Sequence, residues 1–268
     1  MPRKWLLPLA LCIAAVASPA DCEEQSFVSA TARAKNSSAR LIAAEPGADG
    51  AYLAGVEIAL QPKTLTYWRQ PGEAGEPPRF DFSRSENVAS VEPLFPVPKH
   101  IEEAGALVAG YDASVIFPLR VTARDAKAPV KLDLELNYAA CRDMCLPARA
   151  HLSLTPPLSG ASPFAAALKA ALARVPRQLT GEESQAQLKV ARAGEAQWRL
   201  DYRGPGKAMD VFAEGPDPLY VDAARSKSGA GFDLTLSTNG ATPPADGVPT
   251  TLTIVIDQGA VEGQVLLK

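Results

Sequence analysis

The feature that most limits the possible folds is a pair of alternating runs joined by two cysteines, "VKLDLELNYAACRDMCLPARAHLSL" (130–154). Apolar residues take the even-numbered positions in both runs, which is the period of a half-buried β-strand. Between the runs, Cys141 and Cys145 are separated by three residues. In one extended strand their Cα atoms would lie about 13 Å apart, so a bond between them needs a chain reversal. The pattern predicts a β-hairpin with a three-residue loop.

The surrounding sequence has the same β character. The runs "YLAGVEIAL" (52–60) and "SVIFPLRVTA" (114–123) are apolar and rich in β-branched residues, and they predict further strands. The segments "RQPGEAGEPPRF" and "EPLFPVPKH" hold too much Pro and Gly for helices or central strands. We therefore expect an all-β sandwich over residues 21–158, with long loops that can carry a binding surface.

A change of pattern follows the sandwich. Residues 159–180 predict one amphipathic helix, with Ser162 as N-cap, Pro163 at the first position and Pro176 at the end, and we expect it to join two domains. Alternation returns in residues 181–268, which predict a second, smaller β domain. That segment contains no cysteine, no histidine and no catalytic constellation. We expect it to be a structural or partner-binding module.

The amino terminus has the layout of an export signal. Residues 1–20 begin with basic residues, continue with a short apolar run and end in small residues, so we expect cleavage near Ala20. Cys22 follows an aspartate, which argues against lipidation. No later run is long and apolar enough to span a bilayer, so we expect no membrane insertion after cleavage. The formal net charge of -3, with no dense basic patch, argues against a nucleic-acid partner.

The position of the two cysteines leaves their role open. Both have odd numbers, so they point away from the apolar face, toward solvent or toward a covering loop. Closing so short a loop removes only about 2 kcal/mol of unfolded-state entropy. Arg142 favours a thiolate on Cys141, whereas Asp143 opposes it. A redox couple, a passive staple and a copper site all remain possible.

The copper alternative is Cu(I) held by Cys141 and Cys145, with Met144 nearby. On an extended strand His151 lies about 20 Å from Cys145, too far to share the site. His100 stands in a Pro-rich segment and is interpreted as a solvated loop residue. Zinc is poorly served because a closed tetrahedral site needs four ligands. We expect no resident cofactor.

Four ordered blocks carry a family resemblance. They are "LTYWRQPGEAGEPPRFDFSRSENV", "PLFPVPKH", "AGYDASVIFPLRV" and "ACRDMCLP". Together they resemble the amino-terminal periplasmic domain of the DsbD family of thiol:disulfide interchange proteins, including the copper-tolerance relatives called ScsB. The resemblance runs from about Phe27 to Pro157. It implies an immunoglobulin-like β-sandwich in a periplasmic protein.

The resemblance also implies a function for the cysteine pair. Cys141 and Cys145 match the reactive pair, which receives electrons from a thioredoxin-like domain and passes them to periplasmic clients. A loop caps the disulfide in that family, and the segments Tyr67-Trp68-Arg69 and Phe80-Asp81-Phe82 are candidates for it, with Tyr67, Trp68 and Phe80 as shielding residues. This sequence shows neither membrane spans nor a thioredoxin-type CxxC. We therefore expect a separate chain, thioredoxin-like or a DsbD-type membrane reductase, to supply electrons. The rival interpretation is a non-catalytic binding module with a structural hairpin disulfide.

Overall fold

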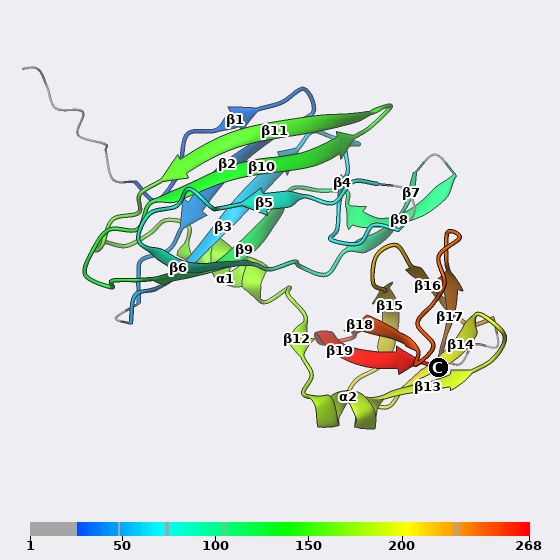
Figure 1. Ribbon diagram of the computed structural model, residues 1–268. Helices are drawn as coiled ribbons and strands as arrows, with labels where there is room; N and C mark the ends of the chain where they lie inside the picture. The colour runs from blue at the N-terminus through cyan, green and yellow to red at the C-terminus, as the bar shows by residue number, and fades with distance from the viewer. Residues whose placement is uncertain (1–25, 48, 73–74, 104, 228, 230) are drawn as a thin grey trace, which may run out of the picture.

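The computed structural model describes residues 26–268 except 48, 73–74, 104, 228 and 230. The expected export signal (1–20) and Cys22 lie outside the described residues. Within the described part the chain is all-β, with two short helices between two groups of sheets (Figure 1). The all-β prediction is confirmed, and the first group is the expected immunoglobulin-like sandwich. The predicted domain boundaries near residues 158 and 180 stay a prediction.

The first sandwich consists of two layered sheets. One has five strands in the order β1 (Ala32–Arg33), β2 (Ser37–Ala43), β3 (Ala51–Leu60), β9 (Val115–Ala123) and β6 (Val88–Pro93). The other has three, in the order β11 (Cys145–Leu154), β10 (Leu132–Cys141) and β5 (Arg79–Asp81). All pairings in these sheets are antiparallel. The apolar even-numbered residues of β10 and β11 face the core between the layers, as their alternation predicts.

The predicted hairpin is confirmed. Strands β10 and β11 pair without a bulge from Leu132↔Leu154 to Cys141↔Cys145, so the two cysteines face each other at the end of the ladder. The three residues between them form the loop. This continuous register fixes which side of the hairpin the cysteines occupy.

A small third sheet lies beside the end of this hairpin. Its strands, in order, are β4 (Thr66–Tyr67), β8 (Ala106–Tyr111) and β7 (Lys99–Glu103). Val108 and Tyr67 from this sheet pack with Ala139 and Cys141 in a small apolar cluster separate from the main core. The third sheet therefore covers the outer face of the hairpin at the cysteines.

The connecting segment differs from the sequence prediction. Helix α1 (Ala165–Leu172) begins after Phe164, because Ser162 is used otherwise: its hydroxyl donates to the Ala43 carbonyl and accepts from the Phe164 backbone N–H. Leu168 of α1 is fully buried against the first sandwich. A second helix, α2 (Gly181–Gln187), was not predicted, although Thr180 and Glu183 form a complete capping box at its start.

The second β domain has two four-stranded sheets around one apolar core. The first runs β12 (Arg177–Gln178), β19 (Gly259–Leu267), β18 (Val248–Ile256) and β15 (Ala208–Glu214). The second runs β13 (Leu188–Arg192), β14 (Gln197–Tyr202), β17 (Phe232–Ser237) and β16 (Tyr220–Arg225). Strand β12 pairs in parallel with β19, so part of the predicted linker joins the second domain's sheet.

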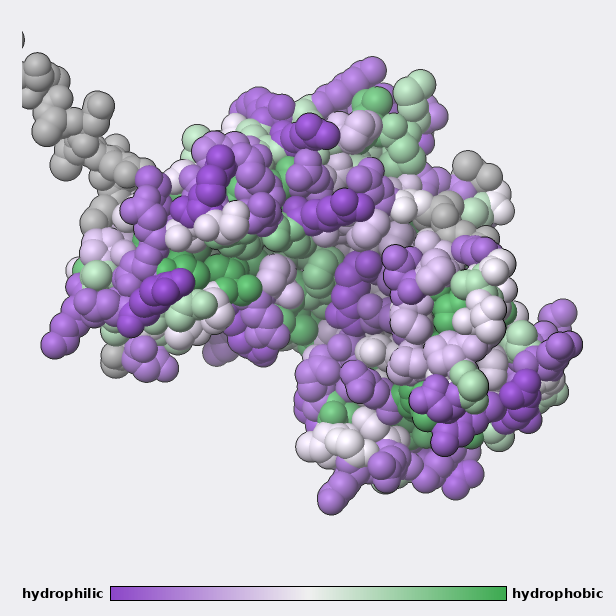
Figure 2. Space-filling model, viewed as in Figure 1, coloured by the Kyte–Doolittle hydropathy of each residue, from purple (hydrophilic) through white to green (hydrophobic). Residues whose placement is uncertain are grey.

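The surface in this view is mainly hydrophilic (Figure 2). An apolar seam on the first sandwich lies between β5 and β6, where a hollow is lined in part by Phe80, Phe82, Val88 and Val91. Here the two layers of the sandwich do not close over each other, since β5 has only three residues. The seam is thus an open edge of the core.

Candidate functional site

The two cysteines are bonded to each other but differ in exposure. Cys141 ends the central strand β10, and Leu65 lies on its other side: the Cys141 N–H donates to the Leu65 carbonyl at 2.9 Å, and the Leu65 N–H donates back at 2.8 Å. Cys145 begins the edge strand β11. Cys141 is therefore 1% exposed, whereas Cys145 is exposed. Cys145 is thus the residue of the pair that lies at the surface.

The parity argument is confirmed in part. Both cysteines lie on the face opposite the main core, as their odd numbers predict. From the sequence, this face could meet either solvent or a covering segment. Cys141 meets a covering segment, because it is buried in the small cluster with Tyr67. Cys145 is exposed to solvent.

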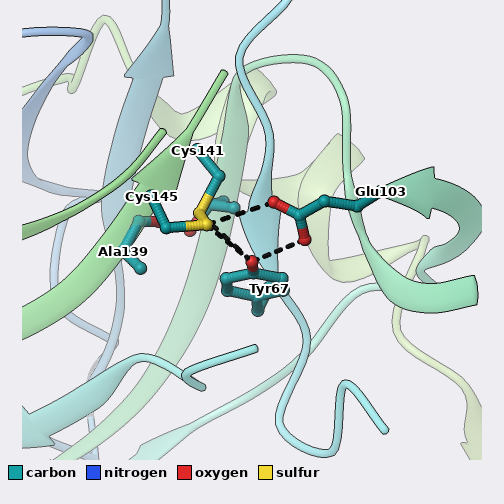
Figure 3. The surroundings of a disulfide bond; sticks show 6 residues. Tyr67, Glu103, Ala139, Cys141 and Cys145 are labelled. Carbon is teal, nitrogen blue, oxygen red and sulfur yellow. Dashed lines mark hydrogen bonds between the residues drawn. A yellow bond between two sulfur atoms is a disulfide. The ribbon is translucent and has the colours of Figure 1, made fainter. Parts of the chain in front are cut away.

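Tyr67 lies against both sulfurs (Figure 3). Its hydroxyl oxygen is 3.1 Å from Cys141 Sγ and 3.2 Å from Cys145 Sγ, and the hydroxyl donates to Glu103 Oε2 at 2.6 Å. Burial, then the hydrogen bond and the charge of Glu103, raise the pKa of Tyr67 well above its ordinary value. Tyr67 is thus a neutral hydrogen-bond donor next to the disulfide.

Glu103, at the end of β7, is the second side chain at the sulfurs. Its Oε1 lies 3.1 Å from Cys145 Sγ (Figure 3). A disulfide sulfur carries no proton, so this contact becomes a hydrogen bond only when Cys145 is a thiol that can donate. Sequence reasoning missed Glu103, which is far from both cysteines in the chain. A signal existed, since Glu103 shares the inward face of its strand with Ile101.

Local sequence features hold Tyr67 in place. Strand β4 pairs with β8 at Tyr67↔Gly110, and a Cβ on Gly110 would lie 2.5 Å from the Thr66 carbonyl oxygen, so only glycine allows this close approach. The Thr66 hydroxyl donates to the Ala139 carbonyl at 2.8 Å. These contacts fix β4 to the third sheet on one side and to β10 on the other.

Two of the three predicted shielding residues are elsewhere. Trp68 is buried, but its ring faces Phe212 of the second domain, with centroids 5.6 Å apart. Phe80 packs edge-on against Phe95 and Phe117 in the first sandwich, because β5 pairs with the middle of β10 and not with its cysteine end. Neither ring contact involves the disulfide, and Tyr67 is the one of the three that lies within hydrogen-bond distance of the sulfurs.

The two histidines both lie away from the sulfurs. His151 lies on β11 with Nε2 3.1 Å from Asp133, so it takes no part at the cysteines, as predicted. The interpretation of His100 as a solvated loop residue is wrong. His100 lies in β7, stacks on Phe212 with centroids 4.3 Å apart, and places Nε2 3.2 Å from the Val211 carbonyl oxygen. It is part of the contact between the domains.

The charged residues of the hairpin loop neutralise each other. Arg142 Nε donates to Asp143 Oδ2 at 3.1 Å, and both side chains are exposed. Met144 is 69% exposed. Neither Arg142 nor Asp143 therefore sets the charge at the sulfurs, where the Glu103 carboxylate lies.

Fold and site define a class of protein: an immunoglobulin-like sandwich that presents an asymmetric disulfide at a hairpin end, beneath a small covering sheet. Residues 36–157 match the family model described as "Thiol:disulfide interchange protein DsbD, N-terminal". The first sandwich is a DsbD N-terminal-like domain, and its cysteine pair forms a disulfide.

A solved structure extends the similarity of fold. The N-terminal periplasmic domain of ScsB from Proteus mirabilis matches with a TM-score of 0.68 and 20% sequence identity, over 90% of this chain and 98% of that one. A match over 90% of the chain includes both β domains. Among curated proteins, no sequence matches this chain. None of the described helices has the length and apolarity needed to cross a bilayer.

Proposed function

We propose that this protein is a periplasmic thiol:disulfide interchange protein that relays reducing equivalents through the Cys141/Cys145 couple. The observation that carries the proposal is the asymmetry of the disulfide, in which an exposed cysteine is bonded to a buried one. Structural disulfides commonly hide both sulfurs, whereas an exchange reaction needs one that a thiolate can reach. The DsbD N-terminal-like fold supports the same function.

Reduction would begin at Cys145. A thiolate of a reduced thioredoxin-like donor attacks Cys145 Sγ, a donor–Cys145 disulfide forms, and the Cys141–Cys145 bond breaks with its electron pair on Cys141 Sγ. The Tyr67 hydroxyl lies 3.1 Å from that sulfur, and it can donate a hydrogen bond to the departing thiolate once its single proton turns from Glu103 Oε2 toward Cys141 Sγ. The buried position of Cys141 makes it a leaving group that stays inside the protein.

The donor then completes the two-electron transfer. Its second thiolate attacks its own sulfur in the mixed disulfide, Cys145 leaves as a thiolate, and the donor departs as an oxidised disulfide. Both cysteines take up protons from solvent. Delivery to a client runs the same steps in reverse: Cys145 attacks the client disulfide, and Cys141 resolves the mixed disulfide, which releases the client as a dithiol.

The partners follow from this chemistry. The donor would be a thioredoxin-like dithiol, free or part of a DsbD-type membrane reductase on a separate chain, and the clients would be periplasmic proteins with accessible disulfides. The predicted export signal and the periplasmic origin of the matched ScsB domain support this location. In an oxidising compartment such a couple is useful only when a donor keeps it reduced.

Adduct mapping tests the proposal. The oxidised mature protein, with Cys22 replaced by serine, is mixed with a reduced thioredoxin whose second active-site cysteine is replaced by serine. We expect a covalent adduct, located on Cys145 by peptide mass spectrometry. The absence of an adduct, or an adduct on Cys141 alone, would contradict the proposed direction of attack.

The reduction potential gives an independent test against the staple alternative. Free thiols of the same protein are counted across glutathione or dithiothreitol redox buffers. We expect a value above about -300 mV, in the range of exchange proteins. A lower value would identify a resistant structural disulfide and a binding module in place of a relay.

A further inference from the structure

We propose that the reduced site binds Zn²⁺ through Cys141 Sγ, Cys145 Sγ and Glu103 Oε1, and that bound zinc withholds the dithiol from exchange. The inference rests on the proposed function in one respect, since the couple must be reducible. It adds a ligand and a mode of control to the same site.

Three donor atoms already lie together. The two sulfurs and a carboxylate oxygen of Glu103 are all within 4.8 Å of one another. In a zinc site with bonds of about 2.3 Å to sulfur and about 2.1 Å to oxygen, tetrahedral geometry separates such donors by about 3.5 to 3.8 Å. Reduction frees the sulfurs to move apart from bonding distance toward this separation. The backbone pairing of Cys141 with Cys145 limits how far they separate.

The carboxylate is held in a ligand's orientation. Tyr67 donates to Glu103 Oε2 at 2.6 Å, so Oε1 remains directed at Cys145 Sγ, 3.1 Å away (Figure 3). Zinc-binding carboxylates and imidazoles are commonly oriented in this way by a hydrogen bond to the atom that does not bind the metal. Tyr67 serves as the orienting partner rather than as a ligand, because its hydroxyl donates its proton to Oε2.

The donor set selects the metal. Two thiolates alone suit Cu(I), but a carboxylate is a hard ligand that Cu(I) does not favour. Calcium and magnesium prefer all-oxygen sites. Zinc accepts sulfur and oxygen in one tetrahedron, and three protein ligands leave its fourth position for water. Glu103, which the sequence did not reveal as a neighbour of the cysteines, therefore favours zinc over the alternative of Cu(I).

An ion can reach the site from the surface. A hollow of about 310 Å³ opens beside the sulfurs, and its lining includes Lys63, Glu102, Glu103, Asp112 and Cys141. The exposed side of Cys145 gives a second approach. Arg142 also lines the hollow and Asp112 is paired with Lys99, so the charge of the lining is mixed, and the open side leaves room for the water that would complete the coordination.

Zinc would compete with exchange because it binds only the dithiol. Both sulfurs would be occupied, so neither could attack a client disulfide. Since zinc binds the dithiol and not the disulfide, each tenfold rise of free zinc above its dissociation constant favours the dithiol over the disulfide by a further factor of about ten. The midpoint reduction potential of the Cys141/Cys145 couple then rises by about 30 mV. Zinc would thus hold the protein reduced but inactive.

Metal titration of the reduced mature protein tests the inference. Cys22 is replaced by serine, Co²⁺ serves as a spectroscopic probe, and Zn²⁺ affinity is measured against a chromophoric chelator under anaerobic conditions. We expect one ion per protein, thiolate-to-cobalt charge-transfer bands and tetrahedral d–d bands. Zinc affinity should fall at least about tenfold in Glu103→Gln. It should be lost in Cys145→Ser.

A control variant and a substitute variant show whether an effect on zinc binding is specific to Glu103. Glu92→Gln, which removes an exposed carboxylate on β6 outside the lining of the hollow, should bind zinc like the parent. If Glu103→Gln fails to fold, Tyr67→Phe takes its place, since it keeps the carboxylate but releases its orientation, and should bind about tenfold more weakly. Zinc affinity unchanged in the variant tested, or a preference for Cu(I) over Zn²⁺ in competition, would overturn the inference.

Failure of this inference is separable from failure of the relay. Thioredoxin adduct formation and the reduction potential are measured with a chelator present, so they report exchange without metal. A protein that exchanges but binds no zinc would overturn the zinc inference alone. A protein whose disulfide cannot be reduced would overturn both, and the thiol count reveals that case.

Discussion

Tyr67 and Trp68 are neighbours in the chain, yet Tyr67 contacts both sulfurs of the disulfide and Trp68 packs on Phe212 of the second domain. Phe212 is 3% exposed and belongs to the apolar cluster of the first sandwich. The second contact point is similar, because His100 stacks on Phe212 and lies on the strand that ends at Glu103. The two segments that supply side chains to the sulfurs therefore both contact Phe212 of the second domain.

Removal of the Phe212 ring should weaken the contact of the second domain with these two segments. We expect Phe212→Ala to lower the free energy of unfolding by about 3 to 5 kcal/mol, the range for a buried aromatic truncation. The disulfide should also be reduced faster by dithiothreitol, because Tyr67 loses the support next to it. Urea unfolding and thiol counting over time measure the two effects.

The control for that variant is Met209→Ala. Met209 lies on the same strand but is 50% exposed, so both quantities should stay near those of the parent. If Phe212→Ala lost stability but its disulfide were reduced at the parent rate, the second domain would not position the residues at the sulfurs.

Glu103 should slow formation of a thiolate on Cys145. A carboxylate 3.1 Å from the sulfur opposes a second negative charge there. In the reduced protein we therefore expect Glu103→Gln to raise the rate at which iodoacetamide alkylates Cys145 at pH 7. Glu102→Gln should have little effect, and equal rates in all three proteins would show that Glu103 does not control the charge at the site.

The sequence predicts the strands well because their signal is local. Alternation over nine residues determines which face of β10 is buried, and the parity of Cys141 follows from it directly. The capping box at Thr180 was equally local and could have predicted α2. His100 was misinterpreted because the prolines before it suggested a loop, whereas the residues after it pair with β8.

The site was predictable only in part, because it is assembled from distant segments. The close spacing of Cys141 and Cys145 reveals the disulfide without any tertiary information. Tyr67 came from a family resemblance. The strand pattern places Glu103 on the same face as Ile101, but its position at the sulfurs depends on how the third sheet packs over the hairpin, which the pattern does not encode. The difference in exposure between the cysteines likewise depends on Leu65, which shields one side of Cys141.

The two cysteines should differ when each is replaced. Either serine variant loses the disulfide, which costs about 2 kcal/mol for so short a loop in the chain-entropy model. Cys141→Ser should destabilise the protein more than Cys145→Ser, because it also buries a hydroxyl in the small apolar cluster, where the Tyr67 hydroxyl is its polar neighbour. Urea denaturation of the two variants, with Cys22 replaced in both, gives the comparison. Equal losses would contradict the burial of Cys141.

The contact at His100 should weaken as the pH rises. Asp210 Oδ1 lies 3.4 Å from His100 Nε2, and the hydrogen bond between them raises the pKa of His100. Burial lowers this pKa, but the negative charge of Asp210 and the hydrogen bond with the Val211 carbonyl also raise it. Because the pKa of His100 is higher in the folded state, the protonated histidine stabilises the protein fully when the pH is below its ordinary pKa of 6.5. This contribution is lost as the pH rises through the pKa of the folded state.

Unfolding free energy measured across that pH range tests the contribution. We expect the parent to lose stability relative to His100→Phe as the pH rises above 6.5. The phenylalanine variant is the matched control, since it keeps an aromatic ring on Phe212 but has no titrating group. Parallel curves for the two proteins would show that the histidine charge does not stabilise the domain contact.

Arg69 makes the charged part of the same contact. It is half-buried over the Trp68 ring and pairs with Glu214, at 2.7 Å from Nε to Oε2, and with Glu262. Burial alone would raise the pKa of Glu262, but the charge of Arg69 and hydrogen bonds from Gln178, Arg69 and Thr253 hold it below its usual value. The pair of Arg69 with Glu262 therefore stabilises the protein above that usual pKa and is lost as the pH falls through the lowered pKa. Burial raises the pKa of Glu214, which acts in the opposite direction.

Arg69→Leu should reverse this pH dependence. Two partly buried carboxylates would remain without their cation, at a cost of about 3 to 5 kcal/mol at pH 7.5. Because protonation then relieves their repulsion, the loss relative to the parent should shrink as the pH is lowered to 5. Urea unfolding of both proteins at the two pH values measures the difference, and the double variant Arg69→Leu with Glu262→Gln should recover part of it at pH 7.5. A loss that is independent of pH would mean that Arg69 acts through packing on Trp68 and not through its charge.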